Sequence, residues 1–506
     1  MTDKYKHLFD TEHLKGDLKG KSIRGGASSL IGESVSFALR LGSTVILARL
    51  LLPEQFGLVG MATALTGFAH IFKDLGLSDA TIQNKDITHE KVSNLFWINA
   101  AIGLLIMLIV ALSASPIARF YKDQRLQGIT LAISSCFFFS GVTVQHQALL
   151  YRQMRFSQIA QINVLSSALS IPVGVILAWM GFGYWALVWK EISASALITA
   201  GMWLKSGWIP SMPRRGLGVS ALLRFGRDMT GFNIVNYFSR SADRILIGRK
   251  WGAIATGLYD RASQLMIMPM NQIRFPMTRV GMAGLSAVQA EPEKYRKYFL
   301  KLISILCFVY MPIVVYLGIF SESVVRLILG DRWIGAADIF KVLAAAAYVQ
   351  PIASTCDLVL ITHGRTKRYF FWGMANSIWI VTAFAIGVHW GSIGVAYAYT
   401  IASYAILLPS LWYRLRNSPI SVSVFFRAIS LPTIASLSMG AFLVLLSPKI
   451  VSLGRVLEIG VSLIFACLAY GGVWVLLPGG KHLLVEYFSY IQALFKNESS
   501  SDSKGF

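Results

Sequence analysis

Basic side chains recur inside stretches of this sequence that are otherwise strongly apolar. Eight of them fall within segments long enough to be membrane helices: Arg40, Lys73, Lys190, Arg240, Arg244, Arg261, Arg274 and Lys341. Each would cost about 2.5 to 3.5 kcal/mol at the centre of a lipid-facing helix, so we expect the set to face a wet interior. Because guanidinium forks match phosphate oxygens in a bidentate way, this excess of arginine predicts a site for a large, phosphate-bearing anion.

Helical spacing places the polar residues of two such segments on one face each. The two stripes are Glu33, Ser36, Arg40, Ser43 and Thr44 in the first segment, and Asn233, Asn236, Arg240, Asp243 and Arg244 in a later one. We expect both stripes to line one central cavity, to which Lys73 also contributes. The alternative is that the charges pair with acids only to lock helices together, and it stays open for Arg244 beside Asp243 and for Arg261 beside Asp260.

Membrane-spanning helices must position these residues. The chain has 506 residues, of which 55% are hydrophobic and only 14% charged, a composition unlike that of soluble globular proteins. Apolar runs of ~20 residues number about fourteen. They lie at roughly 28–50, 55–75, 95–118, 127–150, 158–180, 183–204, 221–248, 253–282, 299–320, 336–362, 370–389, 391–413, 422–447 and 457–477. Their length, without alternation at period two, predicts an all-α polytopic membrane protein.

The net charge of +22 comes mainly from basic residues in predicted loops, so it does not indicate a nucleic-acid partner. Basic residues collect in the N-terminal segment and in the loops that follow even-numbered helices, to which we assign Arg152, Arg214, Arg365 and Arg414 among others. By the positive-inside rule both termini are cytoplasmic. The partners expected from this placement are the lipid bilayer and whatever substrate it carries.

A repeat at an offset of 200 residues relates the two halves of the chain. Ser36, Arg40, Val45, Ile46, Leu47, Ala48, Arg49, Gly57, Leu58, Ala62 and Leu65 fall on Asn236, Arg240, Ile245, Leu246, Ile247, Gly248, Arg249, Gly257, Leu258, Ala262 and Leu265. The matched helices have the same orientation, which predicts a pseudo-two-fold axis along the membrane normal. We expect a tail (1–24), a first lobe (25–208), a linker (209–220), a second lobe (221–417), two further helices (418–480) and a second tail (481–506).

Enzyme motifs are missing from the sequence. It contains no phosphate-binding loop ending in GKS or GKT, no HExxH and no GxSxG, so we expect no catalytic residues. We also expect no metal centre or cofactor, apart from Na⁺ or H⁺ as a coupling ion bound by Glu33, Asp243 or Asp357. The isolated His146, in VQHQALL, is interpreted as a hydrogen-bonded core histidine.

Several longer blocks carry a family resemblance. LPEQFGLVGMATALTGF (52–68), FKDLGLSDATIQ (72–83), QHQALLYRQMRF (145–156), GFNIVNYFSRSADRILIGR (231–249) and GLYDRASQLMIMPMNQI (257–273) are the main ones. Together they resemble the bacterial exopolysaccharide and O-antigen flippases, the polysaccharide-transport branch of the MOP superfamily, of the colanic-acid or succinoglycan exporter type. The resemblance extends from about residue 20 to 415 and is weak in the last two helices.

The resemblance implies two six-helix lobes plus two C-terminal helices, as in MOP and MATE transporters. It also implies that undecaprenyl-pyrophosphate-linked oligosaccharide is flipped by alternating access, for exopolysaccharide or lipopolysaccharide biosynthesis, beside a polymerase and co-polymerase. In the related lipid II flippases, arginines on the first and eighth helices handle the pyrophosphate, and Arg40 and either Arg261 or Arg274 occupy comparable helices. Two alternatives remain: a cation-coupled antiporter of the same fold, and a membrane glycosyltransferase or polymerase acting on the same lipid.

Overall fold

The computed structural model describes residues 5–9, 18–72, 76–84, 87–214, 220–450 and 455–487, and within these ranges the regular structure is helical throughout. By its contacts the chain divides into two compact units, Met1–Asp260 and Arg261–Phe506, called here the N-terminal and C-terminal units. The expectation of an all-α polytopic membrane fold is confirmed. The domain boundaries drawn from the sequence stay predictions.

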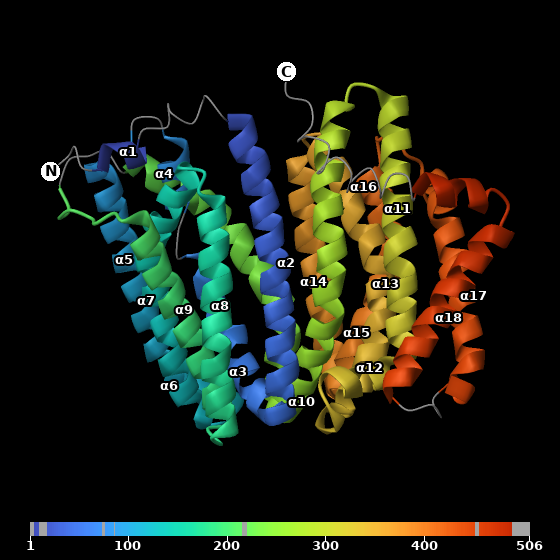
Figure 1. Ribbon diagram of the computed structural model, residues 1–506, viewed down its shortest axis with the longest axis horizontal. Coiled ribbons are helices and arrows are strands. Elements are labelled where there is room, and N and C mark those ends of the chain that lie inside the picture. The colour runs from blue at the N-terminus through green and yellow to red at the C-terminus, as the bar shows by residue number, and fades with distance from the viewer. Residues whose placement is uncertain are drawn as a thin grey trace. The chain divides into compact units, whose positions relative to one another are not determined.

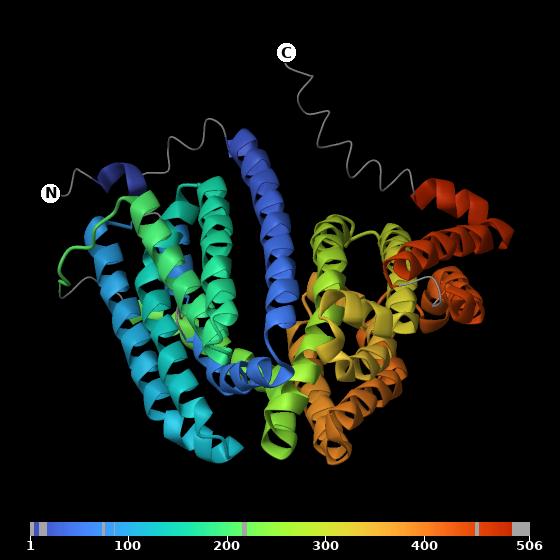
Figure 2. The same ribbon diagram turned by 60° about the horizontal axis from the view of Figure 1, so that its bottom comes forward.

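The N-terminal unit is built from long helices packed side by side. Its helices are α1 (Lys6–Phe9), α2 (Leu18–Leu50), α3 (Pro53–Thr66), η3 (Gly67–Ile71), α4 (Leu77–Gln83), α5 (His89–Leu112), α6 (Ala114–Tyr121), α7 (Arg125–Arg152), α8 (Phe156–Trp179), α9 (Tyr184–Ser206) and the first part of α10 (Ser220–Ala287). Helix α7 packs on both α5 and α9, while α8 packs on α9 and α2 (Figure 1, Figure 2). Glycines permit the approach of α5 and α7, because a Cβ on Gly141 would lie 2.6 Å from the carbonyl oxygen of Asn99.

The C-terminal unit contains the rest of α10 and the helices that follow it. These are α11 (Pro292–Ile319), α12 (Ser321–Ile328), η4 (Asp331–Trp333), α13 (Gly335–Thr362), α14 (Thr366–Gly387), η5 (Val388–Trp390), α15 (Gly391–Ala405), α16 (Leu407–Leu415), α17 (Val422–Ile450) and α18 (Arg455–Leu476). Helix α11 packs between α13 and α17, and α18 packs on α17 (Figure 1). Aromatic and aliphatic side chains such as Phe299, Ile303 and Phe425 form the core where α11, α13 and α17 meet.

As far as the structure describes them, the apolar runs predicted from the sequence fall on helical structure, and the end of the run 55–75 lies outside the described residues. Nine helical stretches among the described residues are long and apolar enough to cross a membrane, judged by length and composition. One of them, Thr366–Ala405, covers two predicted segments, and the run predicted at 391–413 is divided between α15 and α16. The number of fourteen crossings stays a prediction.

Helix α10 contains two predicted segments, 221–248 and 253–282, on either side of a kink. Non-helical backbone interrupts it at Gly252, where φ is 76° and ψ is −168°. A positive φ of this kind is open to glycine and strained for other residues. The break therefore lies between the two segments predicted from hydropathy.

Two glycines related by the 200-residue repeat pack against each other inside the N-terminal unit. A Cβ on Gly57 of α3 would lie 1.7 Å from the carbonyl oxygen of Ala253, and a Cβ on Gly257 of α10 would lie 1.9 Å from that of Pro53. Pro53 and Ala253 are themselves related by the same offset. The two segments thus cross with backbone against backbone, which only residues without a Cβ allow.

Candidate functional site

Helix α2 carries an acid and a base that the structure leaves exposed. The guanidinium of Arg40 lies 4.0 Å from the carboxylate of Glu33, and their side chains are 52% and 73% exposed. Ser36 and Ser43, predicted to share this face, are buried. They lie toward the side of α2 that packs on α8, where a Cβ on Gly32 would meet Ala160 at 2.6 Å. The predicted stripe therefore splits into an exposed pair and a packed edge.

Arg244 of α10 stands at the centre of a buried polar cluster. Its guanidinium lies 3.5 Å from the carboxylate of Asp260, which is only 4% exposed, and donates a hydrogen bond to the hydroxyl of Ser241 at 3.2 Å. Asp243 instead accepts a 2.7 Å hydrogen bond from the backbone N–H of Arg244 and another from the hydroxyl of Tyr259. The side-chain partner of Arg244 is thus Asp260 rather than the adjacent Asp243.

The ion pair of Arg244 with Asp260 spans the break in α10. Arg244 precedes Gly252 and Asp260 follows it, so the pair joins the two segments that the break separates. A buried pair of this kind is strongly sensitive to loss of one partner, because the other charge is then left uncompensated. The sequence left open whether Arg244 binds an anion or pairs with an acid to lock helices together. The ion pair with Asp260 fits the second interpretation.

Tyrosines border the same cluster and were not among the residues picked out from the sequence. The hydroxyl of Tyr237 donates to the carbonyl oxygen of Thr63 at 2.8 Å, which ties α10 to α3. Gly67 makes room for this ring, since a Cβ there would lie 2.3 Å from the Tyr237 hydroxyl. Tyr121, the last residue of α6, is also buried here. Single aromatic residues in an apolar chain give no sequence signal that would separate them from the core.

Three further predicted site residues of the N-terminal half are described by the structure to different extents. Arg240 lies on α10 one turn before Arg244 and its side chain is exposed. Asn236 lies in α10, but its side chain is outside the described part of the structure. Lys73 falls outside the described residues altogether. Arg40 and Arg240, which the repeat relates, are therefore both exposed arginines, the first within a stretch apolar enough to span a membrane and the second within α10.

In the C-terminal unit, Arg274 and Arg261 are half-buried residues of α10. The guanidinium of Arg274 donates to the amide oxygen of Asn271 at 3.2 Å and lies 5.1 Å from the ring centre of Phe275. Both contacts come from α10 itself. The ring of Phe275 supports one face of the planar guanidinium. Such support is compatible with bidentate binding of an anion.

Asp357 of α13, one of the predicted coupling acids, has a basic partner. A nitrogen of the Arg414 guanidinium lies 3.0 Å from its carboxylate, and another donates to the carbonyl oxygen of Ala353 at 2.6 Å. Arg414 is only 7% exposed and lies within α16, so its assignment to a loop was wrong. The ring of Trp372 lies 5.4 Å from the same guanidinium. Burial of Arg414 is thus balanced by a carboxylate, a carbonyl and an aromatic face.

Arg152 was also assigned to a loop from its charge, and this assignment was wrong. It is the last residue of α7 and is buried. Its guanidinium donates to the carbonyl oxygens of Thr81 and Asn84, at 2.9 and 2.8 Å, and to that of Phe9 at 3.0 Å. It therefore binds carbonyl groups at the end of α4, where a helix leaves its last carbonyls unpaired.

The arrangement offers cationic groups for binding and no metal centre within the part of the chain that is described. No group of three or more His, Cys, Asp or Glu residues comes together there. His146 hydrogen-bonds the hydroxyl of Ser206 at 2.8 Å and stacks on Trp203, which confirms its interpretation as a core histidine. The polar chemistry of the site is therefore that of guanidinium, carboxylate and hydroxyl groups.

Comparisons with known proteins find a matching family model, similar sequences and a similar solved structure. A family model described as polysaccharide biosynthesis protein matches residues 46–338, more than half of the chain. The teichuronic acid biosynthesis protein TuaB of Bacillus subtilis is 27% identical over 80% of this chain and 85% of its own length. The succinoglycan biosynthesis transport protein ExoT of Rhizobium meliloti is 25% identical over 81% of this chain and 83% of its own length. The lipid II flippase MurJ, in an inward closed conformation, superimposes with a TM-score of 0.70 at 15% identity, over 88% of this chain and 97% of that one.

Proposed function

Because the chain belongs to the polysaccharide biosynthesis protein family, we propose that it flips a lipid-linked oligosaccharide from one leaflet of a membrane to the other. The substrate would be an undecaprenyl-pyrophosphate-linked repeat unit, delivered for exopolysaccharide or lipopolysaccharide biosynthesis. The chain is a polytopic membrane protein with a flippase fold. One relative is named a transport protein and others are named for polysaccharide biosynthesis, so transport is favoured over catalysis.

The observation that carries the proposal is the pair of exposed arginines, Arg40 and Arg240, at positions related by the repeat. Arg40 lies in a stretch of α2 apolar enough to span a membrane, yet 52% of its side chain is exposed. Arg240 is its repeat partner and is exposed as well. Facing lipid, each would cost about 2.5 to 3.5 kcal/mol, so a water-filled path with an anionic ligand is the favourable surrounding. A pyrophosphate provides the oxygens that two guanidinium forks can bind.

The remaining parts of the mechanism follow from the same chemistry. The guanidinium groups bind pyrophosphate, the prenyl chain stays in lipid, and two conformations expose the site to opposite sides of an inner membrane with both termini cytoplasmic. Na⁺ or H⁺ would bias the exchange through its differential affinity for the two conformations. Asp243, Glu33 and Asp357 are the proposed coupling acids, of which Glu33 lies beside Arg40 and Asp357 beside Arg414. A polymerase and its co-polymerase would receive the product.

The test replaces the exposed arginines. Arg40→Ala and Arg240→Ala should each lower flipping of a pyrophosphate-linked glycolipid in proteoliposomes by roughly tenfold to a hundredfold, because each removes about 1.5 to 3 kcal/mol of charged hydrogen bonding. Lysine at the same positions should give intermediate rates, since it keeps the charge but not the fork. Surface polysaccharide in cells should fall in the same order.

The matched control is Arg296→Ala. Arg296 is an arginine of the first turns of α11 and lies 3.4 Å from Glu293, away from the apolar part of the helix. Its loss should leave flipping unchanged. Wild-type flipping by both Arg40→Ala and Arg240→Ala at normal protein levels would contradict the proposed site. Covalent alteration of the lipid by the purified wild-type protein would favour an enzyme, and transport of organic cations in its place would favour an antiporter.

A further inference from the structure

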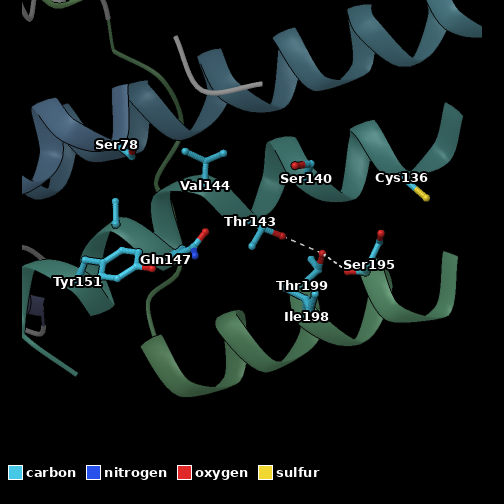
Figure 3. A pocket seen from close by; sticks show the side chains of 11 residues that line it. Ser78, Cys136, Ser140, Thr143, Val144, Gln147, Tyr151, Ser195, Ile198 and Thr199 are labelled. Atoms are coloured by element: carbon cyan, nitrogen blue, oxygen red, sulfur yellow. Dashed lines mark hydrogen bonds between the residues drawn. The ribbon is translucent and has the colours of Figure 1, made fainter. Parts of the chain in front are cut away.

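A polar cavity of about 290 Å³ lies in the N-terminal unit, between α7, α9 and the start of α4. Figure 3 shows hydroxyl and amide side chains of α7 facing those of α9 across this space. The polar side chains used in the argument below are Ser140, Thr143, Gln147, Tyr151, Ser195 and Thr199. None of the candidate pyrophosphate-binding residues whose side chains the structure describes lines this cavity.

The lining follows from helical spacing. Ser140, Thr143, Gln147 and Tyr151 lie at i, i+3, i+7 and i+11 of α7, which places them on one face, and Ser195 and Thr199 lie one turn apart on α9. The hydroxyls of Thr143 and Thr199 hydrogen-bond each other at 2.8 Å across the two helices (Figure 3). The cavity is therefore a built feature of the α7–α9 contact.

Two of the polar groups are available to a ligand. The hydroxyls of Thr143 and Thr199 also contact backbone carbonyls of their own helices, those of Phe139 and Ser195, at 2.7 and 2.8 Å. In contrast, no hydrogen bond joins the side chains of Ser140 and Gln147 to any other described residue. The amide of Gln147 can both donate and accept, and so can the hydroxyl of Ser140.

The chemistry of the lining selects a neutral, hydroxyl-rich ligand. Among the described residues no acidic or basic side chain lines the cavity, which disfavours the pyrophosphate group, and the hydroxyl and amide side chains of the lining disfavour a prenyl chain. Val144 and Ile198 add apolar surface, and the ring of Tyr151 is 37% exposed. A sugar ring presents the same combination, with hydroxyls at its edge and C–H groups on its faces. The cavity, of about 290 Å³, has room for a monosaccharide ring.

We propose that this cavity binds one uncharged sugar ring of the transported glycan, so that the protein recognises its substrate at a glycan subsite distinct from its arginines. The proposal rests on the proposed function. Gln147 and Ser140 bind the sugar hydroxyls, Thr143 and Thr199 accept further hydrogen bonds, and Tyr151 packs on one ring face. A subsite for a single ring gives selectivity for one part of the repeat unit while the rest of the glycan stays in water.

The first experiment measures binding to the purified full-length protein. The probes are the oligosaccharide released by mild acid from the lipid-linked intermediate of the host, the intact lipid-linked form, and undecaprenyl pyrophosphate without sugar. Gln147→Leu and Thr199→Val should each raise the Kd for both glycan probes by at least about fivefold, the effect of one lost hydrogen bond. Neither should change the Kd for undecaprenyl pyrophosphate. The control Ser135→Ala lies on α7 outside the cavity, where its hydroxyl contacts only the backbone carbonyl of Ala132, and it should match the wild type.

A second measurement keeps the proposal testable if a variant folds poorly. Cys136 lines the cavity and is 8% exposed, whereas Cys307 and Cys356 are fully buried and Cys467 is exposed elsewhere. A Cys467→Ala background therefore leaves Cys136 as the most accessible of the remaining thiols. The released oligosaccharide should slow the reaction of Cys136 with a small methanethiosulfonate reagent at least about fivefold. Protection by Na⁺ alone in place of sugar would overturn the proposal in favour of a cation site.

The outcomes separate this proposal from the function on which it rests. If undecaprenyl pyrophosphate and the intact glycolipid both fail to bind or to be flipped, the proposed function itself is wrong. If both bind, but Gln147→Leu and Thr199→Val bind glycan as the wild type does and sugar leaves Cys136 unprotected, only the glycan subsite is wrong. Binding of the released oligosaccharide, weakened by both variants, would support the subsite for free and lipid-linked sugar alike. Binding of the intact form alone, weakened in the same way, would support it for the lipid-linked substrate.

Discussion

Replacing Gly57 by Ala is expected to destabilise the protein by forcing α3 and α10 apart. The new Cβ would lie 1.7 Å from the carbonyl oxygen of Ala253, whereas ordinary contact begins at 3.4 Å, so the two backbones must separate by about 1.7 Å. Overpacking of a core typically costs about 1 to 3 kcal/mol. We expect the upper end of this range, because the obstacle is a main-chain atom that cannot change rotamer.

The reciprocal position makes the prediction sharper. Gly257→Ala places its Cβ 1.9 Å from the carbonyl oxygen of Pro53 and should cost a similar free energy. Once either substitution has separated the segments, the second Cβ meets less resistance. The double variant Gly57→Ala/Gly257→Ala should therefore be destabilised by less than the sum of the single variants, by on the order of 1 kcal/mol or more.

The assay is unfolding of the purified protein in detergent, followed by tryptophan fluorescence against temperature and against denaturant. The matched control is Gly472→Ala in α18, where a Cβ meets nothing within 4 Å. Alanine is the better helix former by about 1 kcal/mol, so this variant should be unchanged or more stable. Wild-type unfolding of Gly57→Ala, or strict additivity in the double variant, would refute a shared backbone crossing.

Two further predictions concern ion pairs. Removing one partner of the pair between Arg414 and Asp357, as in Arg414→Met or Asp357→Asn, should lower the free energy of unfolding by about 3 to 5 kcal/mol, because the other charge stays buried without compensation. Changing both should lower it by less than the sum of the two single losses, which a double-mutant cycle of unfolding measures. A double variant whose loss equals that sum would argue against the pairing. Hydrogen bonds from Arg125 hold the pKa of Asp123 below its usual range, so this carboxylate stabilises the fold at neutral pH and the gain is lost as pH falls through its lowered pKa. Because Arg125 is 44% exposed and also binds Glu54, the difference in free energy of unfolding between wild type and Asp123→Asn should be at most about 1 kcal/mol at pH 7. It should vanish once the pH falls below the lowered pKa of Asp123, and a difference that grows in acid would contradict the prediction.

The positions of the helices could be predicted because apolar length is a local property of the sequence. The division of α10 was equally visible, since hydropathy falls around the glycine at position 252. The burial of Ser36 and Ser43 was not, because the polar face of α2 looks uniform until its packing on α8 is known. A stripe defined by periodicity shows which residues share a face but does not show where a neighbouring helix covers that face.

Buried arginines were the main error of the sequence interpretation. Charge alone assigned Arg152 and Arg414 to loops, yet each is satisfied by groups distant in sequence: carbonyls of Phe9 and Thr81 for the first, and the carboxylate of Asp357 for the second. No local pattern shows such partners. The pairing of Arg244 with Asp260 was missed for the same reason, because it depends on how α10 continues after its break.

The contact of Gly57 with Gly257 also has a meaning for symmetry. In the interface of a two-fold homodimer, residue i of one subunit contacts residue j of the other, and residue j of the first contacts residue i of the second. A residue on the axis contacts its own copy. The segments 53–57 and 253–257 satisfy this pattern within one chain, since Gly57 faces Ala253 and Gly257 faces Pro53. A fused pair of half-length subunits would make the same isologous contact. In a homodimer any change here would occur twice at once, whereas in this chain the two copies can vary independently, provided that each stays without a side chain at the crossing.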